Sequence, residues 1–266
     1  MPLKNTGNVI KKIKINKKNI VLSFDDEKVT ISIEAYSLNY LYVGKSLSRK
    51  EIKALEDFSS LEKAMNYAMS LLKRGHYSEY RIREKLYNKE YSKKDVDQVI
   101  VFLKKHDLVN DDMYAEDYKN YADEKGYGKN HIINDLKNRG IFDKTIAKLK
   151  FSESLEKKKA LKQLKSLERK YTSLSYENKK QHIYSSLLNL GFEHDVVSYA
   201  LNQVKDKNDK EENNNLKRDF DKLYNRLSSR YENKELMDKL MKSLRNKGYR
   251  YNDIKKMMEE KCDEIY

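Results

Sequence analysis

The chain has 266 residues and a single cysteine, Cys262, which excludes an intramolecular disulfide and a cysteine-based zinc site. It carries 56 Lys and Arg against 42 Asp and Glu, a formal net charge of +14, and this excess favours a polyanionic partner. No apolar run approaches the roughly 20 residues that a membrane span needs, and Met1 to Ile20 lacks a signal-peptide core. We therefore expect a cytoplasmic protein that does not enter a membrane.

Residues 1–59 predict a small β-rich cap. The apolar run Ile20 to Leu22, with Phe24, leads into the polar run Asp25 to Lys28, and apolar side chains alternate with polar ones along residues 29–33. This is the pattern of a β-hairpin. Val9 to Ile15 is a plausible third strand of the same meander. A cap of this kind would cover the exposed apolar end of a helical array.

Four copies of one layout organise the rest of the chain. Each copy has an apolar residue, a Leu four residues later, a short turn after four more, and then a second apolar helix face. The turn positions are Glu90, Gly140, Gly191 and Gly248, separated by 50, 51 and 57 residues. A period of this size is typical of repeat proteins.

Each copy predicts a module of three short helices. We place the modules at 60–106, 107–152, 153–205 and 216–266, and the polar stretch 206–215 is the predicted linker before the last one. A unit of this size is marginal alone, so we expect the modules to pack end to end as a monomer. The expected fold is mostly α, with tandem helix-turn-helix-like repeats in an elongated, curved array and a small N-terminal β-meander.

Several helix starts are readable. Ser78 and Ser92 are good N-caps for the second and third helices of the first module, and we expect Asp111 or Asp112 to cap the next helix. Two adjacent carboxylates could also suggest a metal site, but at a helix start they are more often a cap and a partner of the helix dipole. Tyr114, on that helix, is expected to be a core anchor rather than a base-stacking ring.

Basic residues gather on the second helix of the first module. Arg81, Lys85 and Lys89 follow the spacing i, i+4, i+8 and therefore share one helix face. We predict that this face and comparable places in the second module contact an anionic partner, although an ordinary solvated face would show the same spacing. The predicted contact residues are Lys73, Arg74, Arg81, Arg83, Lys85, Lys89, Lys129, Lys137 and Arg139.

The sequence offers little to an enzyme. The five His residues have no ligand spacing, no Gly-x-x-x-x-Gly-Lys loop is present, and no Ser-His-Asp set stands out. We therefore expect no metal, no cofactor and no catalysis. Two alternatives stay open: a helix-turn-helix transcription factor that reads the major groove, and a Mg²⁺-dependent nuclease that uses Asp111 and Asp112.

A set of short motifs follows one another in a characteristic order and spacing: Arg74-Gly75, Ser78 to Leu86, Asp111 to Ala115, Gly128-Lys129, Leu136 to Ile141 and Leu190 to Phe192. Together these motifs resemble the RecX family of bacterial regulators of the RecA recombinase. The resemblance covers residues 60–205 well, and the strand-rich start and fourth module look like the longer members found in low-GC Gram-positive bacteria. It departs from the family at Arg81, where a Glu would complete a capping box, and at Glu90, where a Gly would be free to adopt a positive φ.

The resemblance implies a modulator that lies in the groove of RecA filaments on DNA. Such a protein would inhibit the RecA ATPase, block strand exchange and promote filament disassembly, with weaker electrostatic contacts to single- or double-stranded DNA. It also implies a structural role for one set of motif residues: Asp111, Asp112, Tyr114, Ala115, Gly140, Gly191 and Phe192.

Overall fold

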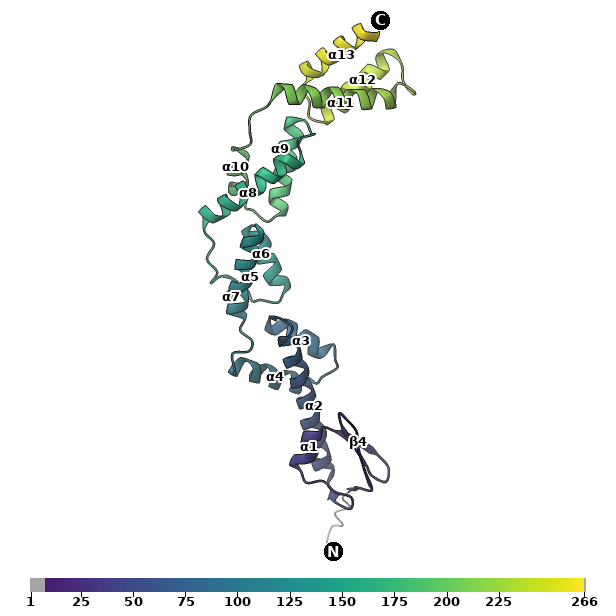
Figure 1. The fold of residues 1–266 in the computed structure, drawn as a ribbon, viewed down its shortest axis with the longest axis vertical. Coiled ribbons are helices and arrows are strands. Elements are labelled where there is room, and N and C mark those ends of the chain that lie inside the picture. Colours follow the sequence, from purple (N-terminus) through teal and green to yellow (C-terminus); the bar gives the residue numbers. More distant parts are fainter. Residues whose placement is uncertain (1–7, 266) are drawn as a thin grey trace. The chain divides into compact units, whose positions relative to one another are not determined.

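The computed structural model describes residues 8–265, which are mostly helical with a small set of strands near the N-terminus (Figure 1). Residues 8–116 with 137–146 form one compact unit, and residues 117–136 with 147–265 form a second. None of the helices in the described part of the chain combines the length and the apolar character that crossing a membrane requires.

The predicted hairpin is confirmed as β3 (Ile20–Ser23) and β4 (Lys28–Ile31), which pair antiparallel. The third strand is also present, but the stretch predicted for it is divided in two. Its second half, β2 (Lys12–Ile15), pairs with β3, whereas its first half, β1 (Asn8–Val9), pairs with β5 (Ser46–Leu47). The meander is therefore three-stranded, with a separate two-stranded ribbon beside it.

The alternation of Ile33 with Val29 and Ile31 predicts that Ile33 continues β4. In the structure Ile33 instead begins a short helix, α1 (Ile33–Leu38). Ser32 ends the strand because its Oγ accepts the Ala35 N–H at 3.1 Å, while its own N–H donates to Ser59 Oγ at 2.9 Å. A buried N-cap thus replaces the last residue of the strand.

The cap and the first module share one helix, α2 (Arg49–Leu72), so the predicted boundary at residue 60 falls inside a continuous element. Its start is fixed by a complete capping box between Ser48 and Glu51. Ile52 and Leu55 belong to the core of the cap, whereas Ala64 and Ala68 belong to the core of the first module.

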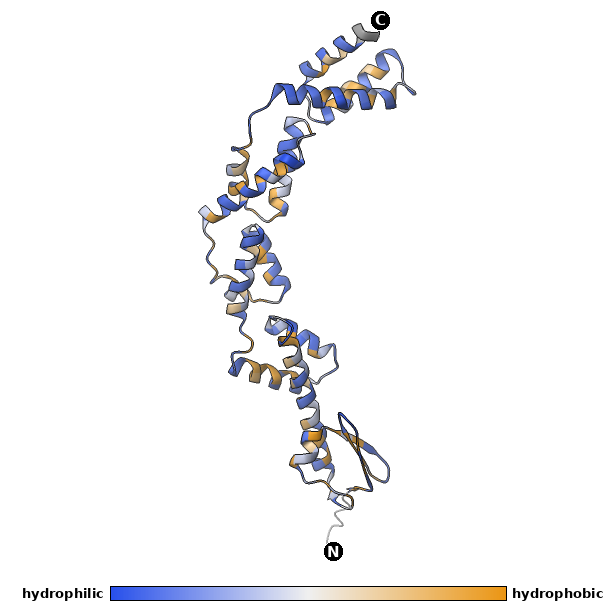
Figure 2. Cartoon of the chain, viewed as in Figure 1, coloured by the Kyte–Doolittle hydropathy of each residue, from blue (hydrophilic) through white to orange (hydrophobic). Residues whose placement is uncertain are grey.

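The repeated layout is confirmed. The apolar pairs four residues apart in the second helices, such as Ile82 with Leu86 and Ile183 with Leu187, are all 0% exposed. Figure 2 shows that α4 is hydrophobic along much of its length. The helices are α3 (Glu79–Tyr87), α4 (Lys93–Lys105), α5 (Asp111–Lys125), α6 (Lys129–Asn138), α7 (Asp143–Ile146), α8 (Glu153–Lys170), α9 (Tyr176–Asn189), α10 (His194–Leu201), α11 (Asp209–Leu227), α12 (Asn233–Asn246) and α13 (Tyr251–Ile265).

The periodic turns all adopt left-handed backbone conformations. The φ angle is 62° at Glu90, 76° at Gly140, 87° at Gly191 and 83° at Gly248. Glu90 therefore holds a conformation that favours Gly, at a cost on the order of 1 kcal/mol. The sequence period marks the places where the second helix of each module stops and the chain turns.

The predicted linker is wrong over residues 209–215, which form the first two turns of α11. Asn208 caps this helix, since its Oδ1 accepts the Lys210 and Glu211 N–H groups. Asn215 is buried and its amide donates to the carbonyls of Thr172 and Leu174. The run lacks apolar periodicity because its polar side chains bond the preceding module, and only the short stretch 202–208 lies between α10 and α11.

Candidate partner and nucleic-acid interface

The N-terminus of α3 is bonded to residues far away in the sequence. Ser78 caps the helix, because its Oγ accepts the Arg81 N–H at 3.3 Å, and the same hydroxyl donates to the Arg139 carbonyl at 2.6 Å. The Glu79 N–H donates to Asp111 Oδ1 at 2.9 Å. We call this set of contacts the first joint, since it links α3 to the start of α5 and to the turn after α6.

The predicted motif residues of the second module lie at this joint. A Cβ added to Gly140 would meet the Tyr80 side chain at 2.2–2.6 Å, so this turn has room only for Gly. Arg139 Nη1 donates to the Tyr114 hydroxyl at 2.9 Å, and Ala115 is completely buried. Tyr114 is half-buried and accepts this hydrogen bond.

Asp111 does not cap α5, contrary to the prediction. Asn110 does so, with its Oδ1 accepting the Asp112 and Met113 N–H groups at 3.0 and 3.2 Å. The Asp111 carboxylate is turned instead to the N-terminus of α3, where a negative charge is favoured. Asp112 is exposed in the first turn of α5.

The same construction recurs twice within the second compact unit. The Lys129 N–H donates to Glu156 Oε2 at 3.1 Å, and the Gly128 N–H donates to the Leu190 carbonyl at 2.8 Å. Further along, the Tyr176 N–H donates to Glu212 Oε2 at 2.9 Å. We call these contacts the second and third joints.

In every joint the second helix of one module receives a carboxylate from the first helix of the next. The third joint also has a Ser175 hydroxyl that donates to the Lys247 carbonyl, beside the turn of the fourth module. The carboxylates were missed because acidic residues in a first helical turn ordinarily serve the dipole of their own helix. Their recurrence, once in each module after the first, was the available signal.

The carboxylate of the first joint, Asp111, is ionised at some cost in folding free energy, and a substitution can measure that cost. Burial raises the pKa of the Asp111 carboxyl, even though the Glu79 N–H opposes the rise. Its folded-state pKa therefore lies above the unfolded value, so the folded chain binds the proton more tightly and the stability contribution falls as pH rises through that window. At neutral pH the ionised form is held at a cost.

Asp111→Asn keeps an acceptor for the Glu79 N–H and removes the charge. We expect the free energy of unfolding at neutral pH to change by less than about 1 kcal/mol, whereas Asp111→Ala should lose about 1–3 kcal/mol by leaving the N–H unpaired. Urea unfolding from pH 4 upward should show a smaller decline with rising pH for Asp111→Asn than for the parent. Glu116→Gln, at an exposed site on the same helix, is the control, and a decline that Asp111→Asn leaves unchanged would contradict the assignment.

Five of the nine predicted contact residues are engaged within the protein. Arg81 Nη2 donates to the Asn138 carbonyl at 3.1 Å, and its other terminal nitrogen pairs with Glu84 at 2.7 Å. Arg83 forms ion pairs with Glu79 at 2.8 Å and Asp97 at 2.6 Å. Lys129 pairs with Glu193 and Lys137 with Asp143, both at 2.9 Å, and Arg139 belongs to the first joint.

The other four residues are accessible on the first module. Lys73 and Arg74 are exposed just after α2, while Lys85 Nζ lies 5.7 Å from the ring centroid of Tyr77 and Lys89 Nζ lies 6.0 Å from that of Tyr67. No ion pair involves any of these four cations within the described part of the chain. We call Lys73, Arg74, Lys85 and Lys89, with Tyr67 and Tyr77, the basic-aromatic face.

Uncompensated cations beside aromatic rings suit a phosphate-bearing partner, because the cations attract phosphates and the rings offer stacking surfaces. The three residues predicted to act together therefore differ in their contacts. Arg81 is bonded to the Asn138 carbonyl beside the first joint, whereas Lys85 and Lys89 remain available to a partner. Within residues 8–261, where side chains are described, no three His, Cys, Asp or Glu residues are grouped to hold a metal ion.

Sequence comparison identifies relatives over most of the chain. A family model described as "RecX, first three-helix domain" matches residues 64–103. The "Regulatory protein RecX" of Clostridioides difficile (strain 630) is 31% identical over 207 residues, covering 74% of this chain and 95% of the relative. The protein of the same name from Streptococcus pneumoniae serotype 19F (strain G54) is 28% identical over 258 residues, covering 94% and 98%.

Two solved structures share the fold. A crystal structure described as regulatory protein RecX matches with a TM-score of 0.58 at 21% identity, covering 74% of this chain and 100% of the other. A second, of RecX from Lactobacillus salivarius, matches with a TM-score of 0.51 at 25% identity, covering 55% and 96%. The helical modules described above are therefore found in experimental structures as well.

Proposed function

The chain belongs to the RecX family of regulatory proteins, and from this premise we propose that it regulates the RecA recombinase by binding RecA filaments on DNA. In this proposal it lies along the filament groove as a monomer, inhibits the RecA ATPase and strand exchange, promotes filament disassembly and so modulates recombinational DNA repair. The observation that carries it is the basic-aromatic face, whose six residues all lie inside the matched family region 64–103.

The modular construction supports the same function. Each module presents only a small surface, and a single contact of that size would be weak. Modules linked by joints convert later contacts into intramolecular ones, so that weak contacts add through effective concentration. A filament repeats the same binding surface along its length, so several modules of one chain can bind it at once.

The test is the single-stranded-DNA-dependent ATPase of preformed RecA filaments, titrated with the protein at fixed salt. We expect the parent protein to inhibit at levels too low to coat the DNA. Lys73→Glu, Arg74→Glu, Lys85→Glu and Lys89→Glu, combined in one variant, should raise the half-inhibitory concentration at least roughly tenfold, because repulsion replaces attraction to the phosphates and acidic groups of the filament.

The matched control reverses four exposed lysines of the cap: Lys12→Glu, Lys14→Glu, Lys17→Glu and Lys18→Glu. It makes the same change in net charge on the same compact unit, and we expect at most about a threefold effect, from long-range electrostatics. Equal losses in the two variants would mean that overall charge, and not the basic-aromatic face, governs inhibition.

The second candidate is a DNA-binding protein of the helix-turn-helix type that acts on DNA directly. The same basic-aromatic face favours it, because stacking and phosphate contacts also serve bare DNA. It predicts inhibition only at protein levels that saturate the DNA in a parallel binding assay. We further propose that the protein is not an enzyme, and Mg²⁺-dependent cleavage of plasmid DNA by the pure protein would contradict this.

A further inference from the structure

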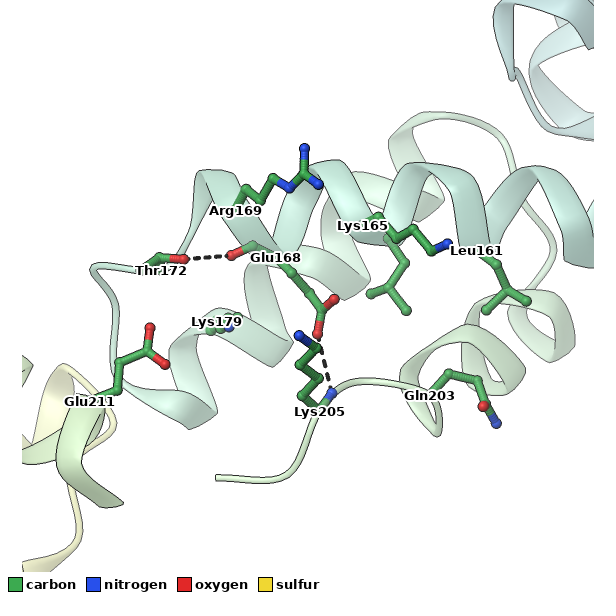
Figure 3. Close-up of a pocket in the computed structure, with 10 residues that line it drawn as sticks. Leu161, Lys165, Glu168, Arg169, Thr172, Lys179, Gln203, Lys205 and Glu211 are labelled. Carbon is green, nitrogen blue, oxygen red and sulfur yellow. Dashed lines mark hydrogen bonds between the residues drawn. The ribbon is translucent and has the colours of Figure 1, made fainter. Parts of the chain in front are cut away.

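The third module contains a hollow of about 600 Å³ that none of the predicted contact residues lines. Figure 3 shows it between α8, α9 and the segment that follows α10. Its volume lies in the range of ligand-binding clefts. The cations that line it are Lys165, Arg169, Lys179 and Lys205.

Two carboxylates, Glu168 and Glu211, also line the hollow, so the cations outnumber the acids. Glu168 extends from α8 toward Lys205, and its Oε1 accepts the Lys205 backbone N–H at 3.2 Å (Figure 3). None of the four cations takes part in an ion pair among the residues the structure describes. The hollow therefore has a net positive charge.

Lys165 and Arg169 belong to a longer row on α8. Lys158, Lys162, Lys165 and Arg169 follow the spacing i, i+4, i+7, i+11, which places them on one face of the helix, and all four are exposed. At 1.5 Å per residue the row is about 16 Å long. Like charges at this spacing repel one another along a helix, and an anion bound across them would relieve that repulsion.

We propose that the α8 row and the hollow beside it form a binding site for the phosphate groups of a nucleic-acid backbone. The row extends beyond the reach of one phosphate group, which favours a polymer over a free nucleotide. Thr172 does not offer a free donor to bases, because its hydroxyl donates to the Glu168 carbonyl. Contacts of this kind position a backbone without reading its sequence, so binding is sequence-independent.

Any role of this site in regulating RecA rests on the proposed function. The binding of nucleic-acid phosphates by the site does not depend on it. It lies two modules away in sequence from the basic-aromatic face and uses a different helix, so the two surfaces can be disabled separately.

The experiment measures fluorescence anisotropy of a labelled oligothymidylate strand with the full chain, from about 50 to about 200 mM salt. The site variant combines Lys165→Gln, Arg169→Gln and Lys205→Gln. The control combines Lys217→Gln, Lys222→Gln and Arg226→Gln, three exposed cations of α11 that form no ion pair among the described residues. Both variants lose the same charge, and matching far-UV circular dichroism and thermal melting confirm that they fold.

We expect the site variant to bind roughly tenfold more weakly at the lower salt, and the slope of log affinity against log salt to fall by about 2, because three phosphate contacts are lost at about 0.7 each. The control should change affinity less than about twofold. An equal loss in both variants, or an unchanged slope in the site variant, overturns the proposal.

A competition experiment distinguishes the phosphates of a nucleic-acid backbone from those of a free nucleotide. ATP added at constant ionic strength should fail to displace the strand from the parent protein at concentrations below about 1 mM. Displacement at micromolar ATP, lost in the site variant, would assign the hollow to a free nucleotide and overturn the backbone assignment.

The RecA ATPase assay on the same proteins keeps the two proposals distinct. If the parent fails to inhibit RecA but the site variant still loses oligonucleotide binding, the proposed function fails and this site stands. If inhibition is normal but the site variant and control bind the strand alike, the site fails and the proposed function stands.

Discussion

Lys159→Met is expected to lower the free energy of unfolding by about 3–5 kcal/mol, mainly the cost of leaving the buried Glu156 carboxylate without its counterion. The Lys159 side chain is 6% exposed, and its Nζ lies 2.5 Å from Asp123 Oδ1 and 2.6 Å from Glu156 Oε1. It also donates to the Tyr127 carbonyl at 2.7 Å. Methionine fills a similar volume but satisfies none of these three acceptors.

The loss should concentrate at the second joint, because Glu156 is also the acceptor of the Lys129 N–H. Urea unfolding of the full chain measures it, and Lys158→Met is the control, since Lys158 is exposed and the described residues give it no ion pair. The control should stay within about 0.5 kcal/mol of the parent. Adding Glu156→Gln to Lys159→Met should recover part of the stability by removing one uncompensated charge. Similar losses in the two single methionine variants would contradict the role of Lys159.

The local part of this fold is readable from the sequence because its signals are local. The pairs Ile82 with Leu86 and Ile183 with Leu187 follow helical spacing and are buried, and the turns at Gly140 and Gly191 coincide with the sequence period. Helices commonly stop at a left-handed residue, and Gly adopts that conformation without strain. Periodicity and turn chemistry therefore predict where elements begin and end.

The joints are harder to read, because their bonds connect residues far apart in the sequence, and the recurrence of a carboxylate in each later module does not identify its partner. The polar run that contains Glu212 and Asn215 looks like a solvated linker until their partners, the Tyr176 N–H and the Thr172 carbonyl, are known. The same holds for the split of the N-terminal strand between two partners. Polar residues acquire their roles from distant partners, and one sequence does not reveal the pairing.

In the candidate site, too, the local pattern can be read from the sequence but the distant contacts cannot. Helical spacing predicts a basic face on α3, but whether a cation is available depends on acids from other elements. Arg83 is neutralised by Asp97 of α4, and Lys129 by Glu193 beside α10. Lys165 and Arg169 are not among the predicted contact residues, and Glu168, which precedes Arg169, accepts a backbone N–H from Lys205. Counting charge along the chain therefore missed the accessible cations of the third module.

Gly128→Ala is expected to lower the free energy of unfolding by about 3 kcal/mol, through overpacking and the loss of backbone hydrogen bonds. An added Cβ would lie 2.4 Å from the Gly191 carbonyl carbon and 2.4 Å from the Phe192 nitrogen. Both are backbone atoms, so no side-chain rotation relieves the clash and the start of α6 must move away. The bonds from the Gly128 and Asn130 N–H groups to the Leu190 and Gly191 carbonyls, 2.8 and 2.9 Å long, would then break.

Gly75→Ala is the matched control, because no heavy atom lies within 4 Å of a Cβ added there and its φ is not left-handed. It should be neutral or slightly stabilising, by up to about 1 kcal/mol. Urea unfolding compares the two, and faster amide exchange at Asn130 in Gly128→Ala would locate the damage at the second joint.

Gly128→Ala also asks whether the joints matter for function, because it leaves every cation of the basic-aromatic face and of the α8 row in place. If the modules act together, loosening the second joint lowers the effective concentration of each later contact. Inhibition of the RecA ATPase should then weaken, under conditions where the variant stays folded, while Gly75→Ala inhibits like the parent. Unchanged inhibition by a folded Gly128→Ala protein would mean that the modules on either side of this joint contribute independently.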